Sequence, residues 1–175
     1  AAGDLNGTYY TFTVELEEGI REACDPYART SGVNGHRAMI LDLRSTDPEG
    51  WEEDRDPNAG KNITDAIIYE LHVRDLSSDA SSGIENRGKF LGVIEEGTHT
   101  PDGIPTGLDH IKSMGVTHLH LLPVYDYGSV DEAHPEQEQF NWGYDPVNYN
   151  VPEGSYATDP FHGEVRVKEF KQMVQ

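Results

Sequence analysis

A polar stretch at residues 139–150 carries the residue types that bind sugars. It reads QFNWGYDPVNYN, in which four aromatic residues are interleaved with amides and one carboxylate. Aromatic rings stack on the apolar faces of a pyranose, while amide and carboxylate groups hydrogen-bond its hydroxyls. From composition alone, a compact loop that packs its own aromatic side chains is an equally good interpretation. The stretch is therefore a hypothesis for a sugar pocket.

Two other groups contain residue types that bind metals. His118 and His120 lie two apart on one face of an expected strand, and such a pair can bind zinc. No third ligand follows at a suitable spacing, so we favour hydrogen-bonded interior histidines. Asp126, Asp131 and Glu132 offer oxygen ligands for calcium, but they lack the alternating ligands and the glycine of an EF-hand loop. They predict a solvated acidic loop, and we assign no metal within the chain.

Signatures of other chemistries do not occur in the sequence. There is no phosphate-binding G-x-G-x-x-G or G-x-x-x-x-G-K and no G-x-S-x-G, the usual signatures of nucleotide binding and serine hydrolysis. Asp126 could be paired with Asp145 or Glu153 for acid–base catalysis. With 32 Asp and Glu among 175 residues, however, such a pair arises by chance. We assign no catalytic pair.

The net charge of the chain limits the classes of partner that it is expected to bind. Lys and Arg total 13 against 32 Asp and Glu, for a formal net charge of −19. This disfavours nucleic acid and anionic membrane surfaces, whose binding depends on cationic residues, while a neutral sugar polymer meets no repulsion.

The single cysteine, Cys24, cannot form an internal disulfide. Residues 1–10 lack the order of a signal peptide, and the localisation stays open between secreted and cytoplasmic.

The first 60 residues are typical of short strands separated by turns. The β-branched and aromatic run at residues 9–14 and the apolar run at residues 38–43 each predict a strand. Too few strands are present for two closed sheets, so this part is expected to be the end of an all-β sandwich. Residues 47–61, rich in Pro, Gly and acids, predict a linker that Trp51 pins to a neighbouring element.

The pattern changes to strand, helix, strand after the linker. Residues 66–73 and 116–124 are nearly continuous apolar runs, typical of parallel strands buried on both faces. A helix is expected between them, with Thr106 as N-cap and Gly115 as left-handed C-cap residue. A further helix is predicted at 164–174. This order is the opening of an α/β domain.

Two long connections, residues 74–105 and 125–163, leave the C-terminal ends of the predicted strands. Connections beyond about 15 residues are uncommon in compact domains and usually carry function. In a (β/α)8 barrel, active sites are built at this end of the strands. We therefore expect the functional residues in these two segments.

Several of these segments resemble one known family. They are YELHVRDL at 69–76, TGLDHIK at 106–112, VTHLHLLPVYDYGSVDE at 116–132 and NWGYDP at 141–146. Together they are similar to type I pullulanases, bacterial enzymes of the α-amylase superfamily, whose hallmark is Y-N-W-G-Y-D-P. Phe140 replaces the first tyrosine of that hallmark, which removes a hydroxyl and keeps the ring. The resemblance extends upstream through 21–29 and downstream through 151–174, and thus covers nearly the whole chain.

The resemblance implies a fold and a substrate. Residues 1–62 would be the C-terminal part of a starch-binding-like β-sandwich domain with its linker. Residues 63–175 would be the N-terminal part of the catalytic barrel, with its first two βα units. In the family, Tyr144 would stack under the sugar at the cleavage subsite and Asp145 would hydrogen-bond there, while Trp142 and Asn141 would shape the loop.

The resemblance also implies the chemistry of the parent enzyme. It would cleave α-1,6 bonds in pullulan, amylopectin and limit dextrins by double displacement, which needs two carboxylates about 5–5.5 Å apart. In the family these lie on later barrel strands, beyond residue 175, so we expect no catalytic residue in this chain and no activity from it alone. No cofactor is required, although the family allows calcium in the longer protein. The alternatives are isoamylase-type or amylopullulanase activity, a non-catalytic glucan-binding piece, and a piece without independent function.

Overall fold

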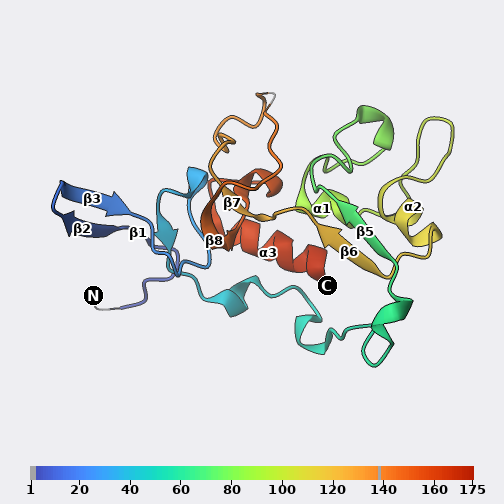
Figure 1. Cartoon of the computed structure of the whole chain (residues 1–175), viewed down its shortest axis with the longest axis horizontal. Coiled ribbons are helices and arrows are strands. Elements are labelled where there is room, and N and C mark those ends of the chain that lie inside the picture. The colour runs from blue at the N-terminus through green and yellow to red at the C-terminus, as the bar shows by residue number, and fades with distance from the viewer. Residues whose placement is uncertain (1–2, 138) are drawn as a thin grey trace.

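The computed structural model describes residues 3–137 and 139–175 and shows a mixed chain of short helices and strands (Figure 1). The described strands form four separate two-stranded sheets. The longest described helix, α3 (Gly163–Val174), lies between the N-terminal sheets and the parallel pair of strands. None of the helices in the described part of the chain has the length and apolar character of a membrane-spanning segment.

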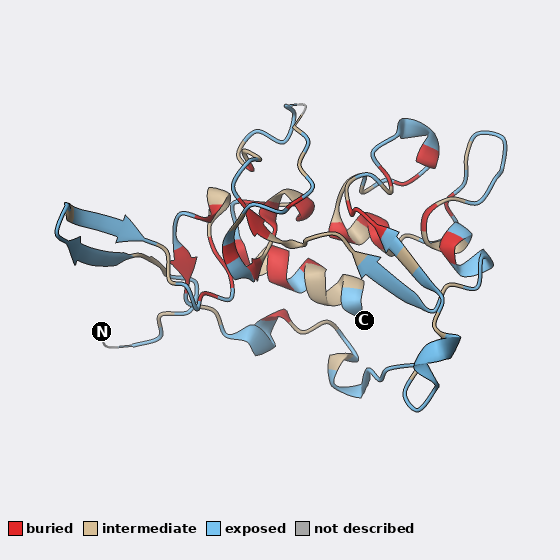
Figure 2. Ribbon diagram, viewed as in Figure 1, coloured by how far each residue is buried: buried red, intermediate tan, exposed pale blue. Residues whose placement is uncertain are grey.

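The N-terminal residues form two of these sheets. Strand β1 (Tyr9–Tyr10) pairs antiparallel with β4 (Ala38–Met39), and β2 (Phe12–Leu16) forms a hairpin with β3 (Gly19–Ala23). The predicted strand 9–14 is thus split between two sheets. The hairpin projects from the rest of the chain, and its side chains are exposed (Figure 2).

The second predicted strand, residues 38–43, is shorter in the structure than the sequence predicts. It ends at Met39, because the carboxylate of Asp42 accepts a 3.1 Å hydrogen bond from the Arg44 amide and starts the 3₁₀ turn Leu43–Thr46. Aspartate side chains often compete in this way with strand hydrogen bonding. Apolar content alone therefore overestimated the strand.

The linker lies along α3. The Lys171 ammonium is 5.5 Å from the centre of the Trp51 ring, within the range of a cation–π contact. The same nitrogen donates to the Leu43 carbonyl at 2.6 Å and to the Asp47 carboxylate at 2.5 Å. The prediction that Trp51 pins the linker is confirmed, and the neighbouring element is α3.

The strand–helix–strand prediction is confirmed. Strand β5 (Ile68–Leu71) pairs parallel with β6 (His118–Leu121), and α2 (Gly107–Ser113) lies between them in sequence. Thr106 is the N-cap residue by position, but its hydroxyl bonds to the Ser82 carbonyl at 2.5 Å instead of capping the helix. Gly115 has φ +74°, the left-handed conformation expected after the helix.

The prediction that these two strands are buried on both faces is wrong for this chain. Ile68 is 63% exposed and Leu119 is 38% exposed, whereas Leu71 at the end of β5 is buried. Among the described residues β5 and β6 are a two-stranded sheet, so burial reaches only their C-terminal ends (Figure 2).

The two long connections contain elements of their own. The first includes α1 (Phe90–Val93), and the second includes β7 (Tyr125–Tyr127), β8 (Pro146–Pro152) and the 3₁₀ turn Gly154–Tyr156. Strands β7 and β8 pair antiparallel with irregular register.

These elements build the core between β5, α1 and α3. Its buried members are Val73, Phe90, Val93, Tyr127 and Tyr156. The ring of Phe90 lies 5.4 Å from the rings of both Tyr156 and Phe170, edge to face. The core therefore joins both connections to α3.

Candidate functional site

The loop at residues 139–145 is held by a network centred on Asn141. Its side-chain oxygen accepts a 2.6 Å hydrogen bond from the Gly143 amide, which closes a tight turn. Its side-chain nitrogen donates to Asp145 at 2.6 Å and to the hydroxyl of Ser129. Gly143 has φ +86°, and an added Cβ would lie 3.0 Å from Pro123. Only glycine suits this turn.

The turn places three aromatic rings at the surface. Phe140, Trp142 and Tyr144 are 59%, 63% and 66% exposed. Together with Ser129, Asn141 and Asp145 they line a shallow hollow of about 500 Å³. The structure thus brings together the four predicted residues Asn141, Trp142, Tyr144 and Asp145, and these exposed rings are not packed into a core of the loop's own.

The fourth ring of the stretch lies elsewhere. Tyr149 belongs to β8, and its ring centre is 5.5 Å from that of Tyr125. It does not line the hollow. The predicted sugar site is therefore narrower than the stretch 139–150.

The contacts of Asp145 keep its carboxylate ionised and oriented as a hydrogen-bond acceptor. Its carboxylate accepts from the Ser129 hydroxyl and from the Asn141 amide, and these bonds, the first most strongly, hold its pKa below the usual value. The carboxylate is therefore ionised and fixed in direction beside exposed rings. This combination suits a neutral polyhydroxyl ligand.

The two histidines considered for zinc lie outside this site. His118 and His120 are both exposed on β6. The His118 ring nitrogen Nδ1 is 2.8 Å from the Thr117 hydroxyl, and His120 Nδ1 is 3.4 Å from the Glu70 carboxylate. The expectation of interior histidines is wrong at both positions, because β6 is open to solvent in this chain.

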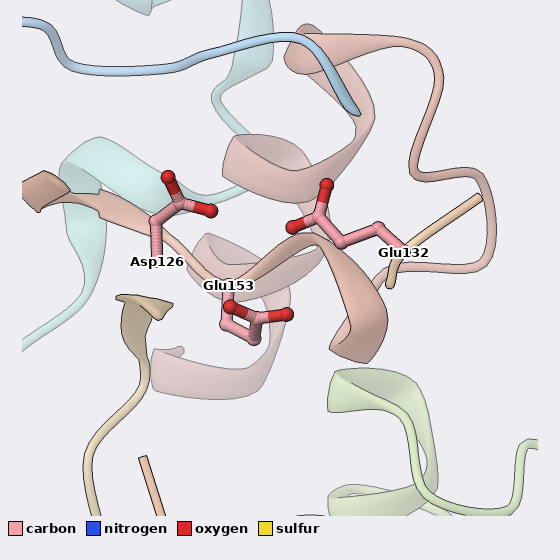
Figure 3. A group of neighbouring side chains, drawn as sticks. All are labelled: Asp126, Glu132 and Glu153. Atoms are coloured by element: carbon pink, nitrogen blue, oxygen red, sulfur yellow. The ribbon is translucent and has the colours of Figure 1, made fainter. Parts of the chain in front are cut away.

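The prediction of a solvated acidic loop is wrong for two of its three members. Asp126 and Glu132 are each only 1% exposed, and they meet Glu153, which is fully buried. Oxygens of the three carboxylates lie within 4.8 Å of one another (Figure 3). Asp131 alone keeps to the surface, where it bonds Asn34 and His134.

Arg166 supplies the cation of this buried acidic cluster. Its guanidinium lies 2.8 Å from Glu132 and 3.4 Å from Asp126, and it is fully buried. The same guanidinium bonds the Ser31 hydroxyl at 3.2 Å and the Pro160 carbonyl at 3.1 Å. The cluster therefore ties the N-terminal part of the chain to α3, and an arginine occupies the place where a metal would otherwise be considered.

Burial raises the pKa of two of these carboxyl groups. For Asp126 the pKa rises to about 7, because burial and the nearby Glu132 disfavour the charge more than Asn148 and Arg166 favour it. For Glu153 it rises to about 8, again because of burial and then Glu132. Between these values and the ordinary ones near 4, the folded chain binds more protons than the unfolded chain.

The stability of the chain is therefore expected to fall as pH rises. A carboxyl group whose pKa is raised on folding stabilises the fold fully below its unfolded pKa, and this contribution is lost as pH rises towards 7–8. Urea unfolding at pH 5.5 and pH 8.5 should show a loss on the order of a few kcal/mol at the higher pH.

Asp126→Asn isolates the contribution of the buried acidic cluster to this pH dependence. The exposed pairs His134–Asp131 and His162–Asp159 raise the pKa of each histidine and so act in the same direction. The Asn variant keeps these pairs and removes one titrating buried carboxyl, so its stability should depend less on pH. An equal slope in both proteins would contradict the assignment.

The sequence did carry a signal for the cluster. Arg166 directly precedes Val167 and lies four residues before Phe170, so it falls on the apolar stripe of the predicted helix. A charged residue on a buried stripe requires a buried partner of opposite charge. Reading the stripe this way predicts buried acids elsewhere in the chain.

Comparison with known proteins gives one consistent result. A crystal structure of pullulanase from Paenibacillus barengoltzii, in complex with maltohexaose and α-cyclodextrin, is 57% identical with TM-score 0.96 over 99% of this chain and 27% of that one. Pullulanase from Bacillus acidopullulyticus is 47% identical with TM-score 0.92 over 100% of this chain and 21% of that one. The curated pullulanase of Bacillus subtilis is 40% identical over 98% of this chain and 23% of its own length.

No family model matches the chain. The chain spans about a quarter of the length of the relatives it matches. At these identities, over almost all of its residues, the likeness extends to sequence as well as fold. The chain therefore corresponds to one segment of the type I pullulanases.

Proposed function

We propose that the chain forms one wall of the α-glucan-binding site of a starch-debranching glycoside hydrolase. The whole enzyme would cleave α-1,6 bonds in pullulan, amylopectin and limit dextrins with retention, by double displacement. The observation that carries the proposal is the hollow in which the exposed rings of Trp142 and Tyr144 lie beside the held carboxylate of Asp145. The relative crystallised with maltohexaose supports the ligand class.

The proposed roles follow from the contacts. Tyr144 would stack on the sugar at the cleavage subsite, and Asp145, held by Ser129 and Asn141, would accept hydrogen bonds from its hydroxyls. Asn141 shapes the turn, and Trp142 extends the apolar platform.

The proposal extends to the architecture of the whole enzyme. Residues 1–62 would be the end of a starch-binding-like sandwich with its linker, and residues 63–175 the first two βα units of the barrel. The change from the antiparallel pairs β1–β4 and β2–β3 to the parallel pair β5–β6 supports this division. The catalytic carboxylates would come from other parts of the enzyme, so the chain alone is expected to release no reducing sugar from pullulan. No cofactor enters the proposal, and calcium would belong to the longer protein.

Removal of either ring should weaken glucan binding enough to be seen as lost retardation in a gel. Native electrophoresis of the chain through gels that contain soluble starch or pullulan should show retardation relative to a plain gel. Trp142→Ala and Tyr144→Ala should each weaken binding about tenfold, because a buried aromatic contact contributes about 1–2 kcal/mol. At the millimolar affinity expected of an open hollow, either loss removes the retardation.

Tyr27→Ala is the matched control, because Tyr27 is 80% exposed and lies far from the hollow in sequence. This variant should migrate like the unaltered chain in every gel. A gel with hydroxyethyl cellulose, a β-glucan, should retard none of the proteins. Equal migration of the unaltered chain in starch, pullulan and plain gels would overturn the proposal.

A further inference from the structure

His72 links the core to the loop that carries the aromatic rings. It follows β5 directly and is only 7% exposed. Its ring nitrogen Nε2 lies 2.8 Å from the backbone carbonyl of Asn141. Its ring stacks on that of Phe140, with centres 6.1 Å apart and planes inclined by 30°.

The partners of His72 indicate which ring nitrogen carries a hydrogen. The Asn141 carbonyl only accepts hydrogen bonds, so Nε2 carries the hydrogen and donates to it. On the other side, Nδ1 is 3.3 Å from the backbone amide of Asp75, which only donates, so Nδ1 accepts. The Tyr156 hydroxyl lies 3.2 Å from the same Nε2, and its oxygen faces this N–H. The Asn141 contact therefore requires a hydrogen on Nε2, while Nδ1 faces the backbone amide of Asp75 and, at 3.8 Å, its carboxylate.

Arg74 contacts the same loop two residues before Asn141. It donates to the Gln139 carbonyl, and its guanidinium lies 5.9 Å from the centre of the Phe140 ring. His72 and Arg74 thus contact the backbone on both sides of Phe140. His72 and Arg74, which follow β5, therefore hold the beginning of the loop in place.

Asn141 connects His72 to the groups that would face the sugar. The carbonyl of Asn141 is bonded by His72, while its side chain bonds the Gly143 amide and the Asp145 carboxylate. A shift of the Asn141 backbone would therefore move the turn and release Asp145.

We propose that His72, through its Nε2–H bond to the Asn141 carbonyl, is a positioning residue that holds the aromatic loop in its glucan-binding arrangement. The inference rests on the proposed function, because it assigns to His72 the orientation of that site. His72 does not line the hollow, and it acts through Asn141.

Three substitutions separate the donor at Nε2 from the rest of the ring. His72→Gln places an amide N–H near the position of Nε2, whereas His72→Asn places it near Nδ1. His72→Phe keeps the stack on Phe140 and removes both nitrogens. If the donor to Asn141 matters, only the Gln variant keeps the loop.

Maltohexaose binding is read from Trp142 fluorescence in a Trp51→Phe background, which removes the other tryptophan. His72→Gln should bind within about threefold of the parent. His72→Asn and His72→Phe should bind about tenfold more weakly or worse, the effect of losing one buried hydrogen bond. Thermal unfolding of each variant serves as the structural control. The inference would be overturned if the loss of binding in the three variants simply paralleled their fall in melting temperature and His72→Gln bound no better than the other two.

Two NMR readouts test the inference without any sugar. Long-range nitrogen–proton correlations of the imidazole should show a hydrogen on Nε2, and a ring whose only nitrogen-bound hydrogen is on Nδ1 would overturn the inference. Exchange of the Gly143 amide, which is held by Asn141, should accelerate about tenfold in His72→Phe and His72→Asn and stay unchanged in His72→Gln. Unchanged exchange in His72→Phe would also overturn it.

These outcomes distinguish the two proposals. If the parent chain fails to bind maltohexaose while the imidazole and Gly143 results hold, the proposed function fails and the loop-holding contact stands. If the parent binds and His72→Phe binds equally well, the proposed function stands and the role of His72 fails.

Discussion

Replacement of Arg166 by methionine is expected to lower the free energy of unfolding by about 3–5 kcal/mol, because it removes the cation that pairs with the buried carboxyl groups of Asp126 and Glu132. Methionine fills much of the same volume, so the effect comes mainly from the uncompensated charge and the lost hydrogen bonds. Urea unfolding followed by circular dichroism measures it. The loss should be larger at pH 8.5 than at pH 5.5, because protonation of Asp126 and Glu153 relieves the repulsion at the lower pH.

Lys168→Met is the matched control on the same helix. Lys168 is exposed two residues further along α3, so its replacement should change stability by no more than about 0.5 kcal/mol. Equal effects of the two substitutions would show that the buried acidic cluster does not hold α3 in place. A stabilised Arg166→Met variant would contradict the account of the cluster outright.

Phe90→Ala is the second substitution with a large expected effect, a loss of about 3–5 kcal/mol. Phe90 is fully buried, and its ring packs edge to face on Tyr156 and Phe170. Alanine would leave a cavity between α1 and α3, where the core joins the two long connections. Since small domains are stable by about 5–15 kcal/mol, this variant should unfold at much lower urea concentrations.

Phe161→Ala removes the same side chain from the surface, where Phe161 is 53% exposed. It should cost no more than about 0.5 kcal/mol. Similar losses at positions 90 and 161 would mean that the Phe90 cluster is not the core. Because both substitutions replace phenylalanine by alanine, any difference between their effects comes from how deeply each side chain is buried.

The local elements were predictable because their signals are local. The apolar runs before and after α2 gave the parallel pair β5 and β6, and Gly115 marked the end of the helix. Burial was not predictable in the same way, since it depends on what packs beside an element. Ile68 is exposed although its strand is as apolar as one in the middle of a sheet.

The site was predictable where its contacts are close in sequence. Asn141 and Asp145 are four residues apart, and the aromatic residues around them are ordinary sugar-binding types. The contacts that hold the site are distant in sequence. His72 reaches Asn141 across 69 positions, and Arg166 reaches Glu132 across 34. The charge of Glu132 predicted a solvent-exposed side chain, because its partner Arg166 lies in a distant segment of the sequence.

The measurement that tests the central claim most directly is an NMR titration of the chain with maltohexaose, observed at the two indole N–H signals. The chain has two tryptophans, of which Trp142 lines the aromatic hollow and Trp51 packs against Lys171. We predict that the Trp142 signal and the amides of residues 139–145 shift in a saturable way while Trp51 stays in place. Shifts at Trp51 without Trp142, or no shift at either, would contradict the assignment of this loop as a glucan-binding wall.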